Sequence, residues 1–248
     1  MDKKKIIKVS ISTFVLLAIM LLCGKNYMYT HGLSGEYENK EAKEGQIKVA
    51  CIGDSITYGH GVEDWADNNY PAQLQKLLGD EYNVANYGSS GACVNLDGDQ
   101  PYWSRDVYQA SLAYDADIII FMLGTNDSKS KNWTDIDAFM KDYMELLETY
   151  LKSGKQPQVY IGVCAEAYYT EEHDPSTGVA GFDIQPAVVD EIAERLLLMS
   201  TSSVYPFSVI DIHALTEAHP EWFEADGIHP NADGAKAIAE AVAEAIRK

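Results

Sequence analysis

The chain has 248 residues, of which 46% are hydrophobic and 23% charged, and its formal net charge is −19. This length allows one domain of good size or two very small ones, and the composition is that of a globular protein without repeats. A surface with this much negative charge repels phosphate backbones and anionic lipids. We therefore expect no nucleic-acid partner and no polyanionic substrate. Neutral substrates fit best.

Residues 1–24 are predicted to be a signal peptide or a membrane anchor. Lysines near the start precede an unbroken apolar run, Phe14 to Cys23, of only ten residues. That is the length of the apolar core of a signal peptide, whereas a membrane-spanning helix needs about 20 residues. Cys23 resembles a lipoprotein acceptor cysteine, but Leu22 stands where that motif has a small residue. We expect an exported protein, anchored through this segment or a lipidated Cys23, or released.

Residues 25–46 are polar and aperiodic, which indicates a linker between the cell envelope and a folded domain at residues 47–248. The cysteines have no spacing typical of a metal or redox motif, and the disulfide status of Cys51, Cys93 and Cys164 stays open. The histidines form no metal-ligand pattern either, so no metal and no cofactor are predicted. His213 is interpreted as a hydrogen-bonded structural histidine.

Apolar runs alternate with amphipathic helical patterns through the domain. The predicted strands are Ile47–Ile52, Tyr82–Ala85, Ile118–Leu123, Val159–Val163 and Ser208–Ile212. The predicted helices lie near Pro71–Leu78, Ser104–Ala113, Ile136–Ser153, Pro186–Ser202 and Ala235–Arg247. The strands are apolar throughout, so both faces of the sheet are covered. The pattern predicts an α/β protein, a three-layer α/β/α sandwich around a five-stranded parallel sheet.

Polar motifs follow four of these strands, at one edge of the predicted sheet. They are Gly53-Asp54-Ser55-Ile56-Thr57, Asn86-Tyr87-Gly88-Ser89-Ser90-Gly91, Gly124-Thr125-Asn126-Asp127 and Asp226-Gly227-Ile228-His229-Pro230. Because parallel strands end at the same edge, residues far apart in sequence converge there. A serine after a strand also suits a helix N-cap, so Ser55 alone decides nothing.

These motifs resemble the blocks of the SGNH subgroup of GDSL-type esterases and lipases, in order and over the whole domain. Ser55, Gly88, Asn126 and His229 match the four residues that name the subgroup. The resemblance implies a flavodoxin-like hydrolase fold and a serine esterase without a cofactor. The G-x-S-x-G elbow of ordinary α/β-hydrolases is absent from the sequence.

The residue types suit ester hydrolysis. Ser55 needs a base, which His229 provides, and Asp226 lies three residues before His229, where one turn can direct its carboxylate at the imidazole Nδ1. The expected oxyanion donors are the backbone N–H groups of Ser55 and Gly88 and the side-chain amide of Asn126.

Aromatic residues gather in the loops at the expected catalytic edge. They are Tyr58, Trp65, Tyr70, Tyr102, Trp103, Trp133, Tyr168 and Tyr169. Trp103 and Trp133 are predicted to contact substrate, and the long connection 165–185 is predicted to border the pocket. Flat aromatic faces beside polar groups suit sugars, so the leading hypothesis is removal of O-acetyl groups from carbohydrates.

Two alternatives remain open from the sequence. A lysophospholipase or thioesterase uses the same three residues with a longer acyl pocket. A non-catalytic glycan-binding domain at the cell surface needs no Asp226–His229 pair, which argues against it. The acyl group, the sugar and the oligomeric state cannot be read from the sequence.

Overall fold

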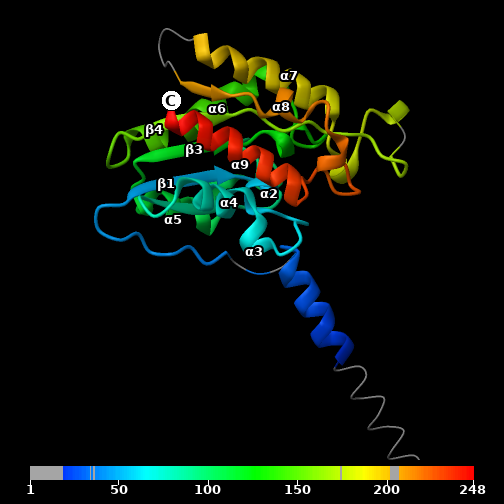
Figure 1. Cartoon of the computed structure of the whole chain (residues 1–248). Coiled ribbons are helices and arrows are strands. Elements are labelled where there is room, and N and C mark those ends of the chain that lie inside the picture. Colours follow the sequence, from blue (N-terminus) through cyan, green and yellow to red (C-terminus); the bar gives the residue numbers. More distant parts are fainter. Residues whose placement is uncertain (1–18, 34, 36, 174, 202–206) are drawn as a thin grey trace, which may run out of the picture.

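A five-stranded parallel sheet, in the order β2-β1-β3-β4-β5, forms the centre of the computed structural model, which describes residues 19–33, 35, 37–173, 175–201 and 207–248. The strands are β1 (Ile47–Gly53), β2 (Tyr82–Gly88), β3 (Ile118–Met122), β4 (Gln158–Gly162) and β5 (Ser208–Ile210). Helices cover both faces of this sheet (Figure 1). The predicted three-layer α/β/α sandwich is confirmed, and the strand order is that of flavodoxin-like folds.

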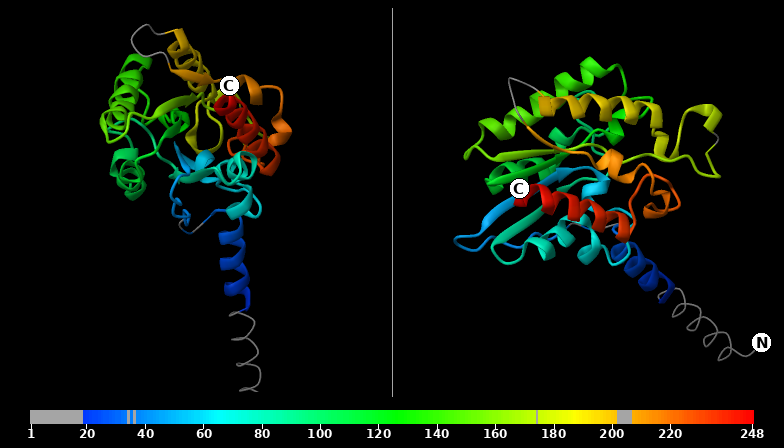
Figure 2. Two further views of the ribbon diagram at one scale, coloured as in Figure 1. Left: turned by 60° about the vertical axis from the view of Figure 1, so that its left-hand side comes forward. Right: turned by 45° about the horizontal axis from the view of Figure 1, so that its top comes forward.

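Side chains that alternate along each strand build two separate apolar cores. Ala50 and Ile52 of β1 pack under one helical layer, whereas Val49 and Cys51 pack under the other. The first layer contains α5 (Asp106–Tyr114), α6 (Ile136–Lys152) and α7 (Pro186–Leu197). The second contains α2 (Ser55–Tyr58), α3 (Trp65–Asn68), α4 (Tyr70–Leu78), α8 (Ile212–Thr216) and α9 (Ala232–Arg247), and Figure 2 shows the layering from two more sides.

Short 3₁₀ turns complete the connections between these elements. They are η1 (Tyr102–Ser104), η2 (Thr125–Ser128), η3 (Pro175–Thr177), η4 (Gly181–Asp183), η5 (Leu198–Thr201) and η6 (Pro220–Trp222). The fifth strand ends two residues earlier than predicted, because Asp211 accepts the N–H of Ala214 and caps α8. The predicted helix 186–202 is α-helical only to Leu197 and continues as η5.

Residues 19–30 form a helix that leads away from the domain (Figure 1). Residues 1–18, most of the predicted signal peptide or anchor, lie outside the described residues. Within the described part of the chain, no helix is both long enough and apolar enough to cross a membrane. The predicted linker is helical up to residue 30, and further along it the side chain of Asn39 donates to and accepts from the backbone of Asn86 on β2.

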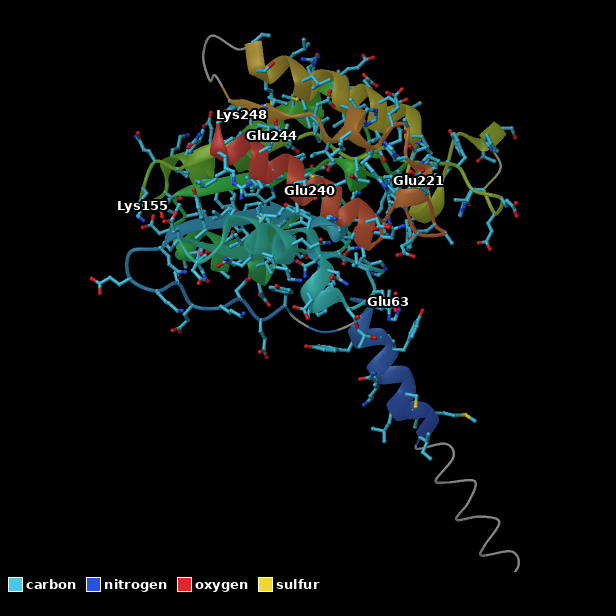
Figure 3. All side chains as sticks on the ribbon, viewed as in Figure 1. Glu63, Lys155, Glu221, Glu240, Glu244 and Lys248 are labelled. Atoms are coloured by element: carbon cyan, nitrogen blue, oxygen red, sulfur yellow. The ribbon has the colours of Figure 1, made fainter. Side chains whose placement is uncertain are left out.

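Charged side chains lie on the outer faces of the helices, as Glu240 and Glu244 on α9 illustrate (Figure 3). All four cysteines are free thiols, and none of them forms a disulfide. Cys51, Cys93 and Cys164 are buried, and Cys23 is exposed on the N-terminal helix. Burial raises the pKa of the Cys51 thiol to about 12, so this group is an inert part of the core.

Candidate active site

The turn after β1 presents Ser55 at the carboxyl edge of the sheet. Asp54 is the N-cap of α2, and its Oδ1 accepts the N–H of Ile56 at 2.9 Å. Ser55 is therefore the first residue of the helix rather than its cap, and its hydroxyl is free for another partner. The position lies between β1 and β3, where the strand order reverses and where α/β sheets of this type bind ligands.

A continuous chain of hydrogen bonds joins Ser55, His229 and Asp226. The Nε2 of His229 lies 2.9 Å from the Oγ of Ser55, and its Nδ1 lies 2.7 Å from the Oδ2 of Asp226. The other oxygen of Asp226 accepts the N–H groups of Ile228 and His229, at 2.8 and 2.9 Å. The carboxylate of Asp226 thus also stabilises the turn between Asp226 and His229. A separation of three residues allows both contacts.

The protonation of this chain follows from its surroundings. Burial alone raises the pKa of Asp226, but the hydrogen bonds and the charge of His229 outweigh it and hold that pKa below its usual value. Asp226 is therefore ionised at neutral pH and accepts a proton from Nδ1. This fixes the imidazole tautomer, and Nε2 turns its lone pair toward the hydroxyl of Ser55.

Asn126 reaches the same place from η2, after β3. Its side-chain amide lies 3.4 Å from the Oδ2 of Asp54, and its backbone carbonyl accepts the amide of Asn132 at 2.8 Å. Burial raises the pKa of Asp54 to about 6. The buried carboxyl group of Asp54 thus caps α2 and also orients the amide of Asn126.

Gly88 does not occupy the position predicted for an oxyanion donor. Its N–H is donated to the side-chain oxygen of Asn86 at 2.9 Å, and it does not line the pocket at Ser55. Gly91, three residues later, lines that pocket together with Ser55 and Asn126. Among the residues that the structure describes, the N–H groups of Ser55 and Gly91 have no hydrogen-bond partner. The signal for Gly91 was present in the same turn motif, as its second glycine.

The pocket at Ser55 is small, with a volume of about 200 Å³. Its walls include Gln100, Lys129, Ile184 and Ile228. Phe182 stands edge-on to His229 with ring centroids 5.2 Å apart, and the ring of His60 lies 4.6 Å from that of His229. Burial and the charge of His229 lower the pKa of His60, so this second histidine is neutral at neutral pH. Sequence reasoning named neither Phe182 nor His60 for the site.

Comparison with known proteins identifies the family of this chain. The model of the GDSL-like lipase/acylhydrolase family matches residues 51–237. The chain belongs to this family. An acetylxylan esterase of Xylanibacter ruminicola is 35% identical over 212 residues, which cover 83% of this chain and 44% of that protein. The chain thus spans less than half the length of this relative.

Solved structures of two esterases share the fold of this GDSL family member. A carbohydrate acetylesterase from Sinorhizobium meliloti superposes with a TM-score of 0.64 at 19% identity, over 82% of this chain and 99% of the other. An aryl esterase from M. smegmatis gives 0.62 at 22% identity, over 81% and 98%. These likenesses show that the chain has the fold of those two enzymes.

The two tryptophans predicted to contact substrate lie elsewhere in this GDSL protein. Trp103 is half-buried, and its indole N–H donates to the carbonyl of Val94 at 3.2 Å. Trp133 packs against Phe139 and lines a separate hollow with Asn95 and Asp142. Neither tryptophan lines the pocket at Ser55. Other aromatic residues of the predicted cluster are buried core residues, namely Trp65, Tyr70 and Tyr102.

The buried carboxyl group of Asp127 connects two loops of the site. The side chain of Asp127 accepts the N–H groups of Val94 and Asn95, at 3.0 and 2.9 Å. Burial raises the pKa of Asp127 to about 7. The residue thereby joins the loop after β2 to the turn that carries Asn126. Its place directly after Asn126 was the available signal in the sequence.

A larger hollow adjoins the pocket. It has a volume of about 580 Å³ and shares His60 and Ser90 with the pocket at Ser55. Its walls include Leu33, Tyr37 and Asn39, together with Tyr58 and residues of α5. The two spaces together offer a narrow compartment beside Ser55 and a wide one next to it.

Proposed function

We propose that the chain is a serine esterase that removes acetyl groups from carbohydrates. The observation that carries this proposal is the chain of contacts from Asp226 through His229 to the hydroxyl of Ser55, at 2.7 and 2.9 Å. These are the distances at which a base activates a serine and a carboxylate orients that base. The pocket beside the hydroxyl provides the room for an ester carbonyl.

In the proposed reaction, His229 removes the proton from the Oγ of Ser55 while that oxygen attacks the ester carbonyl carbon. Asp226 keeps the imidazole in position and stabilises the imidazolium. The carbonyl C–O double bond opens to an oxyanion, which the N–H groups of Ser55 and Gly91 and the amide of Asn126 bind. His229 then protonates the leaving alcohol, and water, activated by the same imidazole, hydrolyses the acyl-serine.

The shape of the site favours a small acyl group on a large alcohol. The pocket of about 200 Å³ is below the size of most ligand sites, and Phe182 and Ile184 border it. The adjoining hollow of about 580 Å³ has room for a sugar ring. The resemblance to an acetylxylan esterase supports a carbohydrate as the alcohol, with the acetyl group as the acyl part.

We also propose that the protein acts outside the cytoplasm. Four apolar side chains at the beginning of the described residues, Ile19, Met20, Leu21 and Leu22, are 50 to 68% exposed on a helix that leads away from the domain. This is the arrangement expected of an export or anchor segment. Fractionation of the producing cells, with antibodies against the domain, tests the location.

Hydrolysis of p-nitrophenyl esters from acetate to decanoate tests the enzymatic proposal, with the Ser55→Ala variant as the control. We expect a rate that depends on Ser55 and that falls steeply beyond acetate or propionate. Release of acetate from acetylated xylo-oligosaccharides by the same preparation then tests the carbohydrate. A rate that rises with chain length would overturn the acetyl assignment and favour a lipid or thioester substrate.

A further inference from the structure

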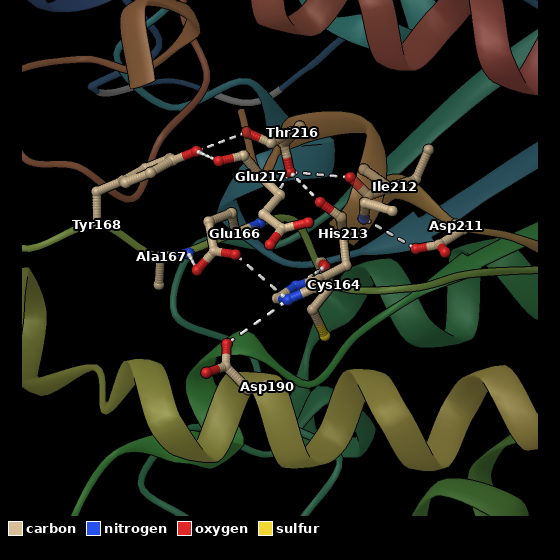
Figure 4. A network of polar contacts seen from close by, with 11 residues as sticks. Cys164, Glu166, Ala167, Tyr168, Asp190, Asp211, Ile212, His213, Thr216 and Glu217 are labelled. Carbon is tan, nitrogen blue, oxygen red and sulfur yellow. Dashed lines mark hydrogen bonds and ion pairs between the residues drawn. The ribbon is translucent and has the colours of Figure 1, made fainter. Parts of the chain in front are cut away.

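Three metal-ligating side chains converge outside the active-site pocket. Glu166 follows β4, Asp190 lies on α7 and His213 lies on α8 (Figure 4). The Nε2 of His213 is 3.3 Å from the Oε2 of Glu166 and 3.5 Å from the Oδ1 of Asp190. We propose that these three residues form a binding site for a divalent transition-metal ion of the zinc type.

The tautomer of His213 is the first step of the argument. Its Nδ1 lies 3.2 Å from the carbonyl oxygen of Cys164, which accepts only, so Nδ1 carries the hydrogen. In the neutral imidazole, Nε2 then turns its lone pair toward two carboxylates. Three electron-rich atoms that face one another repel, and a metal ion between them supplies the positive charge that holds them together.

The distances favour the metal ion over the proton. A charge-assisted N–H···O bond is about 2.7–2.9 Å long, and both contacts of Nε2 are longer than that. In a tetrahedral zinc site with bonds of about 2.0–2.1 Å, neighbouring ligand atoms are about 3.4 Å apart. The observed 3.3 and 3.5 Å match that spacing.

The surroundings of the cluster also suit a metal ion. A ligating histidine usually donates its other N–H to a carbonyl or carboxylate, as His213 does here. The second oxygen of Glu166 is held by the N–H of Ala167 at 3.0 Å. Asp190 is 56% exposed, which gives an ion a route from solvent and leaves a position for water. A histidine with two carboxylates suits zinc better than calcium or magnesium, which prefer oxygen ligands alone.

A bound ion would join three elements around the proposed catalytic turn. The backbone of Glu166 donates to the hydroxyl of Thr216 on α8 at 2.9 Å. Two residues further, the N–H of Tyr168 donates to the carbonyl of Gly227, between Asp226 and His229 in sequence, at 2.9 Å. The ion would therefore stabilise the folded chain from a position outside the pocket, without touching the ester.

Zinc titration of the full chain, produced without a histidine tag and stripped with a chelator, tests the proposal. We expect one Zn²⁺ per chain with a micromolar Kd or tighter, a melting temperature that rises with zinc, and a much weaker response to Ca²⁺. Asp190→Asn and His213→Gln should each raise the Kd at least about tenfold. Glu191→Gln, which removes the same charge from the neighbouring exposed position, should leave the Kd unchanged.

Two results would overturn the metal site. One is the absence of saturable zinc binding up to about 100 μM, which would leave the three side chains as a polar cluster without an ion. The other is an equal Kd for the wild type and Asp190→Asn, which would place the ion elsewhere. Asp190 is exposed, so this variant is expected to fold, and circular dichroism checks that it does.

Discussion

The side-chain amide of Asn126 lies 3.4 Å from the carboxyl group of Asp54, the residue that precedes Ser55. The other oxygen of Asp54 accepts the N–H of Ile56 at 2.9 Å. One buried carboxyl group thus links the turn after β1 to the turn after β3. The distance between the proposed nucleophile and the proposed oxyanion donor is therefore fixed by a side chain that has no role in proton transfer.

Asn126→Ala is expected to lower kcat on p-nitrophenyl acetate by about 100- to 1,000-fold with little change in KM, because the lost amide binds the oxyanion and not the ground-state ester. Steady-state kinetics measure both parameters, and a thermal melt controls for folding. A kcat within a few-fold of the wild type would remove Asn126 from the oxyanion site.

Gly88→Ala is expected to damage the fold. A Cβ at Gly88 would lie 2.1 Å from the backbone nitrogen of Tyr58 and 2.7 Å from the carbonyl carbon of Thr57, and backbone atoms cannot move aside cheaply. We expect a loss of at least about 1–3 kcal/mol in the free energy of unfolding, measured by urea denaturation. Ser89→Ala, at the next position, is the matched control and should be near neutral. Equal stability of the two variants would contradict the close contact.

Gly91→Ala is expected to lower catalytic activity, whereas Gly88→Ala is expected mainly to lower stability. Its φ is +80°, and the nearest atoms to an added Cβ belong to the flexible side chain of Gln100, at 2.7 Å. The chain should fold, with the N–H at position 91 displaced from the pocket. We expect a lower kcat with KM little changed. A kcat equal to that of the wild type would contradict a role for the N–H of Gly91 in binding the oxyanion.

Phe182→Ala is expected to change the preference for acyl length. Phe182 is 56% exposed, borders the pocket and has a φ of +58°, which is strained for a bulky residue. Removal of the ring widens the pocket, so kcat/KM on butyrate and hexanoate esters should rise relative to acetate. Tyr169→Ala, an exposed aromatic outside the pocket, is the control and should keep the wild-type ratio. An unchanged ratio in Phe182→Ala would mean that the acyl group lies on another wall.

Asp127 gives a prediction about pH. Burial raises its pKa to about 7 in the folded chain, whereas an unfolded aspartate has a pKa of about 3.9. The folded state therefore binds more protons between these values, so stability from this group is present below about pH 4 and is lost as pH rises through 7. Relative to Asp127→Asn, the wild type should become less stable between pH 4.5 and 7.5 (about the interval over which Asp127 ionises). Urea denaturation of both chains across this range measures the difference, and a constant difference would contradict the raised pKa.

The sequence was sufficient to predict the layers of the fold and the residues that meet at the sheet edge. Runs such as Ile118 to Met122 are apolar on both faces, and polar turns follow the strands in order. The sequence did not show which glycine of the turn after β2 borders the pocket. That depends on a side-chain contact, because the side-chain oxygen of Asn86 accepts the N–H of Gly88.

Other features depend on packing that periodicity does not encode. Trp103 and Trp133 lie in loops near the correct edge, but their rings pack against the domain. Phe182 sits on the long connection that was predicted to border the pocket, yet its position over His229 follows from a left-handed backbone conformation. The group of Glu166, Asp190 and His213 comes from three elements with no spacing motif, so the sequence indicated no metal.

Labelling with a diethyl p-nitrophenyl phosphate, followed by peptide mass spectrometry, tests the central claim most directly. A serine activated by His229 attacks phosphorus, releases p-nitrophenol and keeps the diethyl phosphoryl group. We predict one label per chain on Ser55, no label in Ser55→Ala, and much slower labelling in His229→Ala and Asp226→Asn. A label on another residue, or full ester hydrolysis by the Ser55→Ala variant, would contradict the account.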